Sequence, residues 1–338
     1  MLVLGSQVNA QVGENHLLSV RKPLIVFVKF HKKPMRKITI IMVILTLLSF
    51  SRFSSWAWSS PGHMVIAAIA YRDFSAAEKD RIAEILRHHP DYEKWKGNYK
   101  PDVPNLDLDT YVFMRASTWP DEIRRKGNPY DHPEWHYIDY PLEPPAFPDK
   151  PGPSPTDDIL YGMAQSEKML RDQNYSPEIR AVYLSWLIHL VGDIHQPLHC
   201  STLVNDDYPA PIGDKGGNNF YVRPAEAAVN LHSIWDKALG ATVNPRAQFN
   251  YAIGICAEYP RANLPELSKD KTPESWSKES RVIAIESGYL RGDLKGSKQK
   301  EDAPALPEKY TQNLKTIAER QAALSGYRLA NEIKQLLQ

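Results

Sequence analysis

Two His/Asp pairs with the same spacing are the clearest chemical feature of the sequence. His189 and Asp193 lie in "IHLVGDIHQPLHC", and His232 and Asp236 lie in "NLHSIWDKAL". Residues four apart on a helix project from one face, with Cβ atoms about 5–6 Å apart. Both pairs have apolar neighbours, and a buried carboxylate is costly unless it is paired or bound to a metal. The spacing therefore indicates either hydrogen-bonded core pairs or metal ligands.

Further residues of the same chemistry favour the metal. A single buried histidine or a single pair is more often a hydrogen-bonded core feature, but two pairs with several matching residues change that balance. Zinc binds His nitrogen and Asp oxygen readily. The additional candidates, each in an apolar or aromatic setting, are Asp121 in "STWPDEIR", His136 in "EWHYIDY", His63 in "WSSPGHMV" and His199 after Pro197.

The other histidines of residues 58–338 and the possible nucleophiles are weaker candidates for a functional site. His195 points to another side of its helix than His189, so we expect it to support a ligand or to have a structural role rather than to be a ligand itself. His88, His89 and His132 have polar, proline-containing contexts and are expected to be solvated. No serine lies in a nucleophile-elbow context, and no Gly-rich phosphate loop occurs.

The two cysteines leave their own state open. Cys200 stands beside His199, which is only a weak indication of a reactive thiol. Cys200 and Cys256 could pair in an exported chain, and the sequence does not decide whether they do.

Charge is distributed unevenly along the 338 residues, whose formal net charge is +1. Residues 1–57 hold eight Lys or Arg and one acid, so residues 58–338 carry 33 basic and 39 acidic side chains, a net charge of −6. Such a chain has no general attraction for nucleic acid or for an anionic membrane. A phosphate group would have to be bound locally, by metals or by a few placed cations.

The N-terminal region has the pattern of a secretory signal peptide. Met35 precedes two basic residues and an apolar run from Ile38 to Phe50, and Ser55 and Ala57 provide small residues for cleavage before Trp58. We therefore expect an over-long extension at 1–34, a signal peptide at 35–57, and a secreted or periplasmic mature chain without stable membrane association. A retained N-terminal anchor is the less favoured alternative, because the apolar run is short for a membrane span.

Residues 58–338 are predicted to form one all-α domain with long loops and at most a short β-hairpin. The best strand is "NNFYVR" (218–223), and the Pro-rich stretch 141–157 reads as a surface loop. Apolar periodicity and N-terminal caps predict helices at 63–74, 75–89, 154–172, 176–196, 224–239, 272–290 and 307–337.

Together, the motifs resemble those of a known enzyme family. They are Trp58 five residues before His63, "WPDEIR", "WHYID", "HLVGDIHQPLH", "GGN", "LHSIWD" and "GYRLAN". This set is similar to that of the zinc-dependent single-strand-specific nucleases of the S1/P1 type, over residues 58 to about 335. The zinc-dependent phospholipases C share the architecture and much of the ligand spacing, so the resemblance implies a mainly helical fold of the phospholipase C/nuclease type.

The resemblance implies three zinc ions. Asp121, His136, His189 and Asp193 would hold the first, and His199, His232 and Asp236 the second. The third would take His63, Asp193 as a bridge, and the amino nitrogen and carbonyl oxygen of Trp58. An amino nitrogen at Trp58 exists only after cleavage before that residue, which agrees with the predicted signal peptide.

The implied reaction is hydrolysis of single-stranded DNA, RNA and 3′-nucleotides by a monomer, with 5′-phosphate products. A water between the two zincs bridged by Asp193 would attack phosphorus, and Arg124 would stabilise the developing charge. Tyr137 would stack on a base and Asp139 would accept from a base edge. Plain core packing is an equal alternative for Tyr137.

Two other functions remain open at the sequence level. A phospholipase C acting on a choline-type head group is disfavoured by Asp236, because those enzymes usually have Glu at this position. A non-catalytic zinc-binding secreted protein is disfavoured by Arg124 beside an intact ligand set. The chain also departs from the fungal family members, since two cysteines cannot form their two disulfides. The span from His199 to His232 is longer, which puts substrate preference in doubt.

Overall fold

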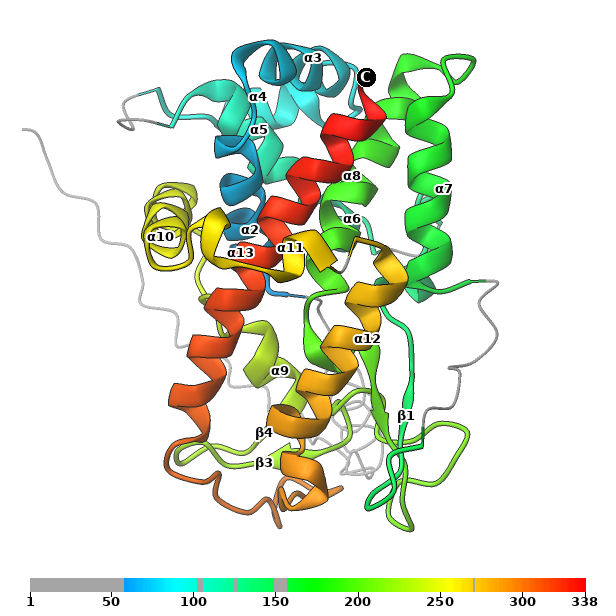
Figure 1. Cartoon of the computed structure of the whole chain (residues 1–338), viewed down its shortest axis with the longest axis vertical. Helices are drawn as coiled ribbons and strands as arrows, with labels where there is room; N and C mark the ends of the chain where they lie inside the picture. The colour runs from blue at the N-terminus through cyan, green and yellow to red at the C-terminus, as the bar shows by residue number, and fades with distance from the viewer. Residues whose placement is uncertain (1–57, 102–105, 125–126, 149–156, 270) are drawn as a thin grey trace, which may run out of the picture. The chain divides into compact units, whose positions relative to one another are not determined.

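Helices form most of the structure and pack directly on one another (Figure 1). The computed structural model describes residues 58–101, 106–124, 127–148, 157–269 and 271–338, all within one unit of residues 54–338. The α-helices are α2 (Ser60–Arg72), α3 (Ala76–Leu86), α4 (Tyr92–Asn98), α5 (Leu108–Ala116), α6 (Trp119–Glu122), α7 (Ile159–Arg171), α8 (Pro177–Asp193), α9 (Leu231–Asp236), α10 (Pro245–Glu258), α11 (Glu266–Lys269), α12 (Pro273–Ile283) and α13 (Tyr310–Leu336). The short turns η1 (Pro133–His136), η2 (Pro197–Cys200), η3 (Arg261–Asn263) and η5 (Leu290–Gly292) are 3₁₀, and η4 (Ala284–Gly288) is a π-helix.

Local sequence signals set the starts of the helices. Ser75 and Glu78 form a reciprocal capping box at α3, with the Ser75 backbone N–H donating to the Glu78 carboxylate at 2.7 Å. Ser176 accepts from the Ile179 backbone N–H at the start of α8, and Pro177 occupies the first helical position. These caps satisfy N–H groups that have no partner within the helix. The predicted N-termini of both helices are confirmed.

Helix α8 is the central element and α13 the longest. Every residue of α8 from Leu184 to Asp193 is buried, and α8 contacts α2, α3, α5, α6, α7 and α13. In Figure 1, α13 (red) runs diagonally across the other helices. A helix that is apolar on all sides is stable only when other helices surround it, so α8 requires this shell.

Helices α2 and α13 approach closely at Gly326. A Cβ built on Gly326 would lie 2.5 Å from Ile69 Cγ2 and 3.1 Å from the Ile66 carbonyl oxygen. Only a residue without a Cβ allows this packing distance. The glycine of "GYRLAN" therefore sets the separation of α13 from the helix that carries His63.

The strands are short and lie in two two-stranded sheets. β3 (Tyr221–Val222) pairs antiparallel with β4 (Val229–Asn230). β3 lies within the strand predicted at "NNFYVR", and the pair is a short β-hairpin of the kind that was expected. β1 (Pro141–Leu142) pairs parallel with β2 (Thr202–Leu203), a pairing that the sequence did not indicate. The mainly helical fold class is confirmed, and the parallel pair adds to the single hairpin that was expected.

Two predicted helices are shorter than expected. The prediction at 224–239 was wrong in its first half, because residues 229–230 pair with β3 and the Asn230 side chain then caps α9 by accepting from the Ser233 backbone N–H. The prediction at 272–290 holds as α-helix only to Ile283, where the π-helix η4 begins. Tertiary pairing overrides helix propensity at such positions.

Some sequence-based expectations lie at or beyond the limits of the described residues. The extension at 1–34 and the signal peptide at 35–57 fall outside them, as do residues 149–156 of the predicted Pro-rich loop. Within the described ranges, no helix is both long enough and apolar enough to cross a membrane. Cys200 and Cys256 are both free thiols.

Substituting Gly326 tests the α2–α13 contact. We expect Gly326→Ala to lower the free energy of unfolding by about 1–3 kcal/mol, because an added methyl group in a packed core forces backbone or rotamer shifts. Gly254 in α10 has no atom within 4 Å of a built Cβ, so Gly254→Ala is the matched control and should be neutral or slightly stabilising. Denaturant unfolding measures both, and equal values for the two variants would contradict the close contact.

Candidate metal centre

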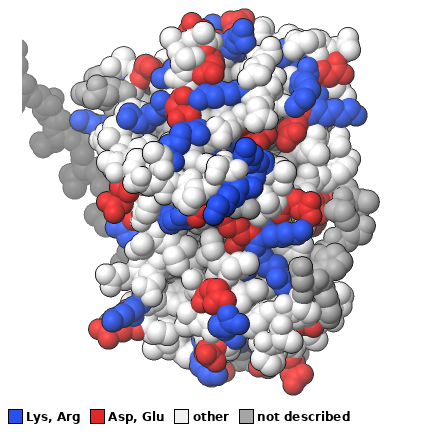
Figure 2. Space-filling model, in the orientation of Figure 1, with Lys and Arg blue, Asp and Glu red and all other residues white. Residues whose placement is uncertain are grey.

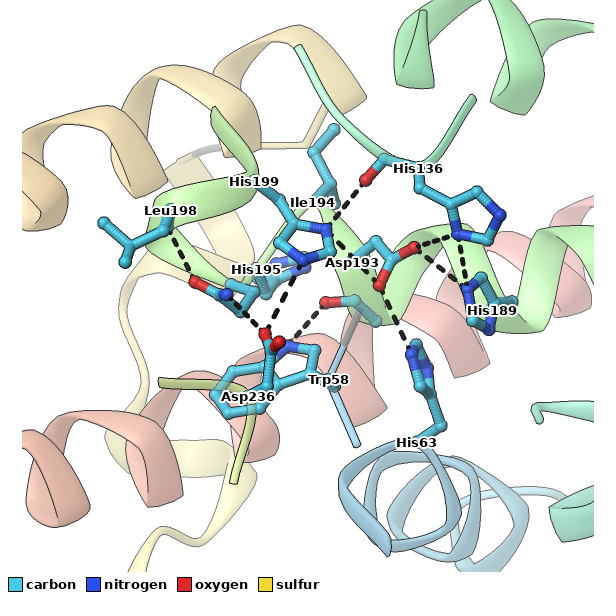
Figure 3. A network of polar contacts seen from close by, with 12 residues as sticks. Trp58, His63, His136, His189, Asp193, Ile194, His195, Leu198, His199 and Asp236 are labelled. Carbon is cyan, nitrogen blue, oxygen red and sulfur yellow. Dashed lines mark hydrogen bonds and ion pairs between the residues drawn. The ribbon is translucent and has the colours of Figure 1, made fainter. Parts of the chain in front are cut away.

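Six separate segments bring the candidate ligands into one buried cluster. His63 comes from α2, Asp121 from α6 and His136 from η1. The other members are His189 and Asp193 on α8, His199 on η2, and His232 and Asp236 on α9. All eight side chains are buried. Figure 3 shows that histidines from four of these segments point at Asp193.

Asp193 is the centre of this cluster and is completely buried. Its position at the last residue of α8 lets both carboxylate oxygens face histidines from different segments. The nitrogen–oxygen distances from Asp193 are 3.3 Å to His63 Nε2, 3.0 Å to His136 Nδ1, 3.0 Å to His189 Nε2 and 3.5 Å to His199 Nδ1.

The ligand-type atoms fall into three groups, within each of which they lie no more than 4.8 Å apart. The groups are Asp121, His136 and His189; His63, His189 and Asp193; and His199, His232 and Asp236. The last group contains the same three residues as the second zinc set implied by the resemblance. The other two groups together contain the side chains of the first and third zinc sets, and His189 is a member of both groups.

Unpartnered polar atoms show that the cluster suits a metal. Buried atoms without a hydrogen-bond partner include both ring nitrogens of His63, both carboxylate oxygens of Asp121, Oδ1 of Asp193, and Nε2 of His199 and His232. Leaving a buried polar group unpaired costs about 1–3 kcal/mol, and these seven atoms lie together in one cluster. Imidazole nitrogens and carboxylate oxygens together form a donor set that fits zinc.

Backbone carbonyls fix the orientation of three histidines. Nδ1 of His189, His199 and His232 lies 2.8, 2.7 and 2.7 Å from the carbonyl oxygens of Ser117, His136 and Gly216, respectively. A carbonyl oxygen only accepts, so each Nδ1 carries a proton and each Nε2 is the nitrogen left to face the cluster. This is the arrangement that metal-binding histidines require from their outer partners.

Gly216 explains part of the "GGN" motif. Its φ is +58°, and a Cβ at this position would collide with the Leu198 carbonyl oxygen. Only glycine combines the positive φ with this close approach. Because the Gly216 carbonyl accepts from His232, the glycine turn determines where His232 points.

Burial and neighbouring charges shift the pKa values within the cluster. Burial lowers the pKa of His63, and it lowers the pKa of His136 and of His232 to about 3. These imidazoles are therefore neutral and able to act as ligands. Burial raises the pKa of Asp236 to about 7, so its ionised form is unfavourable unless a cation offsets the charge.

Asp193 and His189 behave as an ion pair instead. Burial favours a neutral Asp193, but the charges of His189 and His199 outweigh it and hold the pKa of Asp193 well below its ordinary value. Burial likewise opposes the charge on His189, yet Asp193 and Asp121 raise the pKa of His189. The carboxylate is thus ionised and available to a cation.

Arg124, Tyr137 and Asp139 lie beside the cluster rather than in it. Arg124 Nε is 3.4 Å from Asp121 Oδ1 and 3.3 Å from His136 Nε2, and its side chain is partly exposed. Tyr137 is half-buried and donates from its hydroxyl to Glu134. Asp139 is also half-buried, and burial raises its pKa to about 7 while His199 opposes that shift.

Trp58 and His195 support the cluster through α8. The Trp58 ring is fully buried and its Nε1 donates to the Gly192 carbonyl at 2.9 Å. His195 faces away from the cluster, with Nδ1 donating to the Val191 carbonyl and Nε2 accepting from Arg328. Burial, and then Arg328, hold the pKa of His195 well below its ordinary value.

Two of the three histidines expected to be solvated are not. His89 is buried and stacks on Trp95 at 4.4 Å between ring centroids, and His132 is half-buried and stacks on Trp135 at 3.8 Å. Polar neighbours in the sequence misled the prediction, because both rings pack on tryptophans of their own local segments. His88 is exposed, as expected.

Two supporting residues escaped the sequence analysis. Gln196 donates from Nε2 to Asp236 Oδ1 at 2.7 Å, which leaves Asp236 Oδ2 facing His232. Asp214 accepts from the Leu203 backbone N–H at 2.8 Å and from the Tyr289 hydroxyl at 2.7 Å, which anchors the turn that leads into Gly216. An acid within the glycine run "GDKGGN" was the available signal.

A mainly helical protein built around a buried His/Asp cluster matches the class that the sequence motifs indicated. The family model described as S1/P1 Nuclease matches residues 58–338, and the chain belongs to this family. Membership makes it a nuclease, a hydrolase that acts on ester bonds of nucleic acids.

Individual relatives are distant but cover most of the chain. Endonuclease 1 of Arabidopsis thaliana is 24% identical over 313 residues, which cover 87% of this chain and 91% of that protein. Endonuclease 3 of the same plant is 24% identical over 324 residues, 87% of this chain and 95% of that protein. Nuclease S1 of Aspergillus oryzae is 23% identical over 209 residues, 61% of each chain.

Asp214 should make stability depend on pH. Burial raises its pKa from 3.8 to about 6. The folded state therefore holds this proton more tightly than the unfolded state, and stability falls as pH rises from about 4 through about 6. Asp214→Asn lacks this titration, so its free energy of unfolding should gain up to about 3 kcal/mol relative to the parent chain between pH about 4 and about 7.5. Urea unfolding across this range measures the difference, and a constant difference would contradict a raised pKa.

Proposed function

We propose that this nuclease is a secreted zinc-dependent phosphodiesterase and phosphomonoesterase. It hydrolyses single-stranded DNA and RNA to products with 5′-phosphates and also removes phosphate from 3′-nucleotides, at a site for three zinc ions. One observation carries the proposal: buried nitrogen and oxygen atoms without hydrogen-bond partners converge from five segments on a single place. Family membership supplies the nucleic-acid substrate class.

The proposed ligand sets combine the family resemblance with the three observed groups of side chains, which support them. Zinc bound there supplies Lewis-acid polarisation of a phosphoryl oxygen and a water that is acidic near neutral pH. Asp193 is the residue shared between two sets, because its two oxygens face different histidines. The sets are Asp121, His136, His189 and Asp193; His199, His232 and Asp236; and His63, Asp193 and the main-chain nitrogen and oxygen of Trp58.

Arg124 is the proposed electrostatic catalyst. Its guanidinium lies next to Asp121 and His136 and reaches solvent, so it can meet a phosphate that enters the cluster. A fixed guanidinium stabilises the charge that builds up on phosphoryl oxygens in the transition state. Its planar fork of N–H donors also suits bidentate contact with two such oxygens.

Tyr137 and Asp139 are proposed to bind the base. They flank Ile138, whose backbone N–H donates to the His199 carbonyl at 2.8 Å, so this segment is attached directly to η2. An aromatic face favours unpaired bases, because a duplex hides them. With a pKa raised by burial to about 7, Asp139 has both protonation forms near neutral pH and can donate to or accept from a base edge.

Surface charge supports local rather than global recognition of the substrate. On the face drawn in Figure 2, basic and acidic side chains are interspersed and no broad area of one sign appears. Residues 58–338 also carry the net charge of −6 derived from the sequence. We therefore propose a monomer that holds nucleic acid mainly at the cluster, with a modest dependence of binding on salt.

Export is part of the proposal, on the basis of the signal-peptide pattern at 35–57. Cleavage before Trp58 would place a new amino group at this residue. The Trp58 ring is already held by its hydrogen bond to the Gly192 carbonyl, and the backbone N–H of the next residue, Ser59, donates to the Asp236 carbonyl at 2.9 Å. The new terminus would thus be held between α8 and α9. Intact mass of the exported protein identifies the start of the chain.

A substrate panel tests the proposed function. Zinc-loaded protein should cleave single-stranded DNA and RNA, release phosphate from 3′-mononucleotides, and leave 5′-phosphates on its oligonucleotide products. It should not release the head group of phosphatidylcholine. Hydrolysis of the lipid alone would favour a phospholipase C, and inactivity on every substrate with zinc bound would favour a non-catalytic zinc protein.

Asp193→Asn should be the most damaging ligand substitution. The amide keeps the size of the side chain but loses the charge that faces four histidines, so we expect less zinc per chain and loss of activity on every substrate. Metal analysis and the substrate panel measure the two effects. Full zinc content in the variant would show that Asp193 is not a shared ligand.

Arg124→Ala should separate metal binding from turnover. We expect unchanged zinc content and a barrier raised by about 2–4 kcal/mol, the usual loss when a preorganised donor to a transition-state charge is removed. Arg124→Lys keeps the charge but not the planar fork, so its barrier should lie between those of the parent chain and of Arg124→Ala. Loss of zinc together with activity would instead assign Arg124 to holding Asp121 and His136 in place.

A further inference from the structure

Side chains from distant segments bind the carbonyl groups at the C-terminal end of α8. The last carbonyls of a helix have no partner within it, and a buried helix end requires donors from elsewhere. Here these donors come from the start of the described chain, from α12 and from α13. The contacts are Ser325 Oγ to Val191 O at 2.9 Å, Trp58 Nε1 to Gly192 O at 2.9 Å, Ser280 Oγ to Ile194 O at 2.6 Å and Gln321 Nε2 to His195 O at 3.4 Å.

Arg328 of α13 adds a contact to the side chain of His195 in the same turn. Its side chain is only 1% exposed, and its Nη1 lies 2.8 Å from His195 Nε2. Nη2 is 2.7 Å from the Glu279 carboxylate on α12, and the guanidinium lies over the Trp276 ring at 5.4 Å. One buried cation therefore connects α12 and α13 with the turn that follows Asp193.

The hydrogen-bond directions in this contact are fixed. His195 Nδ1 lies 2.7 Å from the Val191 carbonyl oxygen, which can only accept. Nδ1 therefore carries the proton, and Nε2 accepts from Arg328. The imidazole is held at both ends, by the helix it terminates and by α13.

This contact lies midway between two parts of the cluster. His195 is two residues after Asp193 and four before His199. The turn between Asp193 and His199 reverses the chain, so the side chains of these two residues face the same space. Among the described residues, the hydrogen bonds and ion pair of Arg328 go to His195 and Glu279, neither of which is a proposed zinc ligand. Its effect on the cluster would therefore pass through the backbone of this turn.

We propose that Arg328 and His195 are positioning residues that hold the turn from Ile194 to Cys200 in the geometry required for Asp193 and His199 to share a metal cluster. The inference rests on the proposed zinc function of that cluster. It gives the "GYRLAN" motif a role at the site although α13 supplies no proposed ligand. It also implies that the cluster is preorganised before metal binds.

Arg328→Met tests the proposal, because methionine fills similar space without a charge or a donor. We expect zinc affinity, measured by competition with a chelator on folded protein, to fall by about 10- to 100-fold, as for other outer partners of metal ligands. The absorption spectrum of the cobalt-substituted protein should change. In metal-free protein, hydrogen exchange of the backbone amides from Ile194 to Cys200 should become faster.

Two controls separate positioning from general destabilisation. Leu329→Ala removes a fully buried side chain of the same helix. Arg261→Met is the same substitution at an arginine that binds α13 through Tyr327 O and Asn331 Oδ1. Neither should alter zinc affinity, the cobalt spectrum or exchange in the 194–200 turn. If Arg328→Met behaves like these controls, the proposal is wrong.

Further outcomes also decide the matter. If Arg328→Met does not fold, His195→Leu is measured in the same way; it removes the ring nitrogen that accepts from Arg328, and wild-type values for it would overturn the proposal. A chain that binds zinc but cleaves no substrate would refute the proposed function and leave the affinity test valid. If the parent chain binds no zinc, the exchange of the 194–200 amides alone decides whether Arg328 holds the turn.

Discussion

The rest of the structure depends on the burial of the Asp193 carboxylate among four histidine rings. Such a group is stable only if its charge is offset and if every surrounding side chain is held in place. Its ring partners come from α2, η1, α8 and η2, so the long helices must pack before the cluster exists. Atoms that remain without partners there are the cost of a site built to receive cations.

The scaffold reduces this cost by fixing the side chains through the backbone. Carbonyl groups of Ser117, His136 and Gly216 each orient one imidazole, and Gln196 holds one oxygen of Asp236. Most of these partners lie in loops or short turns, which are in turn anchored on α8, α12 and α13. Preorganised ligands lose less conformational entropy when a metal binds. The irregular segments are therefore as important to the site as the helices.

The sequence predicted the parts of the site that depend on local spacing. The i,i+4 pairs on α8 and α9, the capped starts of α3 and α8, and the mainly helical class follow from short-range patterns. The features that depend on packing and pairing did not follow: β4 shortened the helix expected at 224–239, His89 was buried against Trp95, and Arg328 reached His195. Such contacts join residues far apart in the chain or depend on packing that periodicity does not describe. The ligand sets themselves came from the family resemblance, and only the grouping of their side chains is visible in the structure.

Anomalous X-ray diffraction at the zinc absorption edge tests most directly whether the buried cluster is a metal site. We expect three peaks in a crystal of the zinc-loaded mature protein: one bounded by Asp121, His136 and His189, one beside His63 and Asp193, and one bounded by His199, His232 and Asp236. The peaks should disappear from data collected below the edge. A crystal of zinc-loaded protein without a peak in this cluster, or with peaks only at surface residues, would contradict a metal centre at this place.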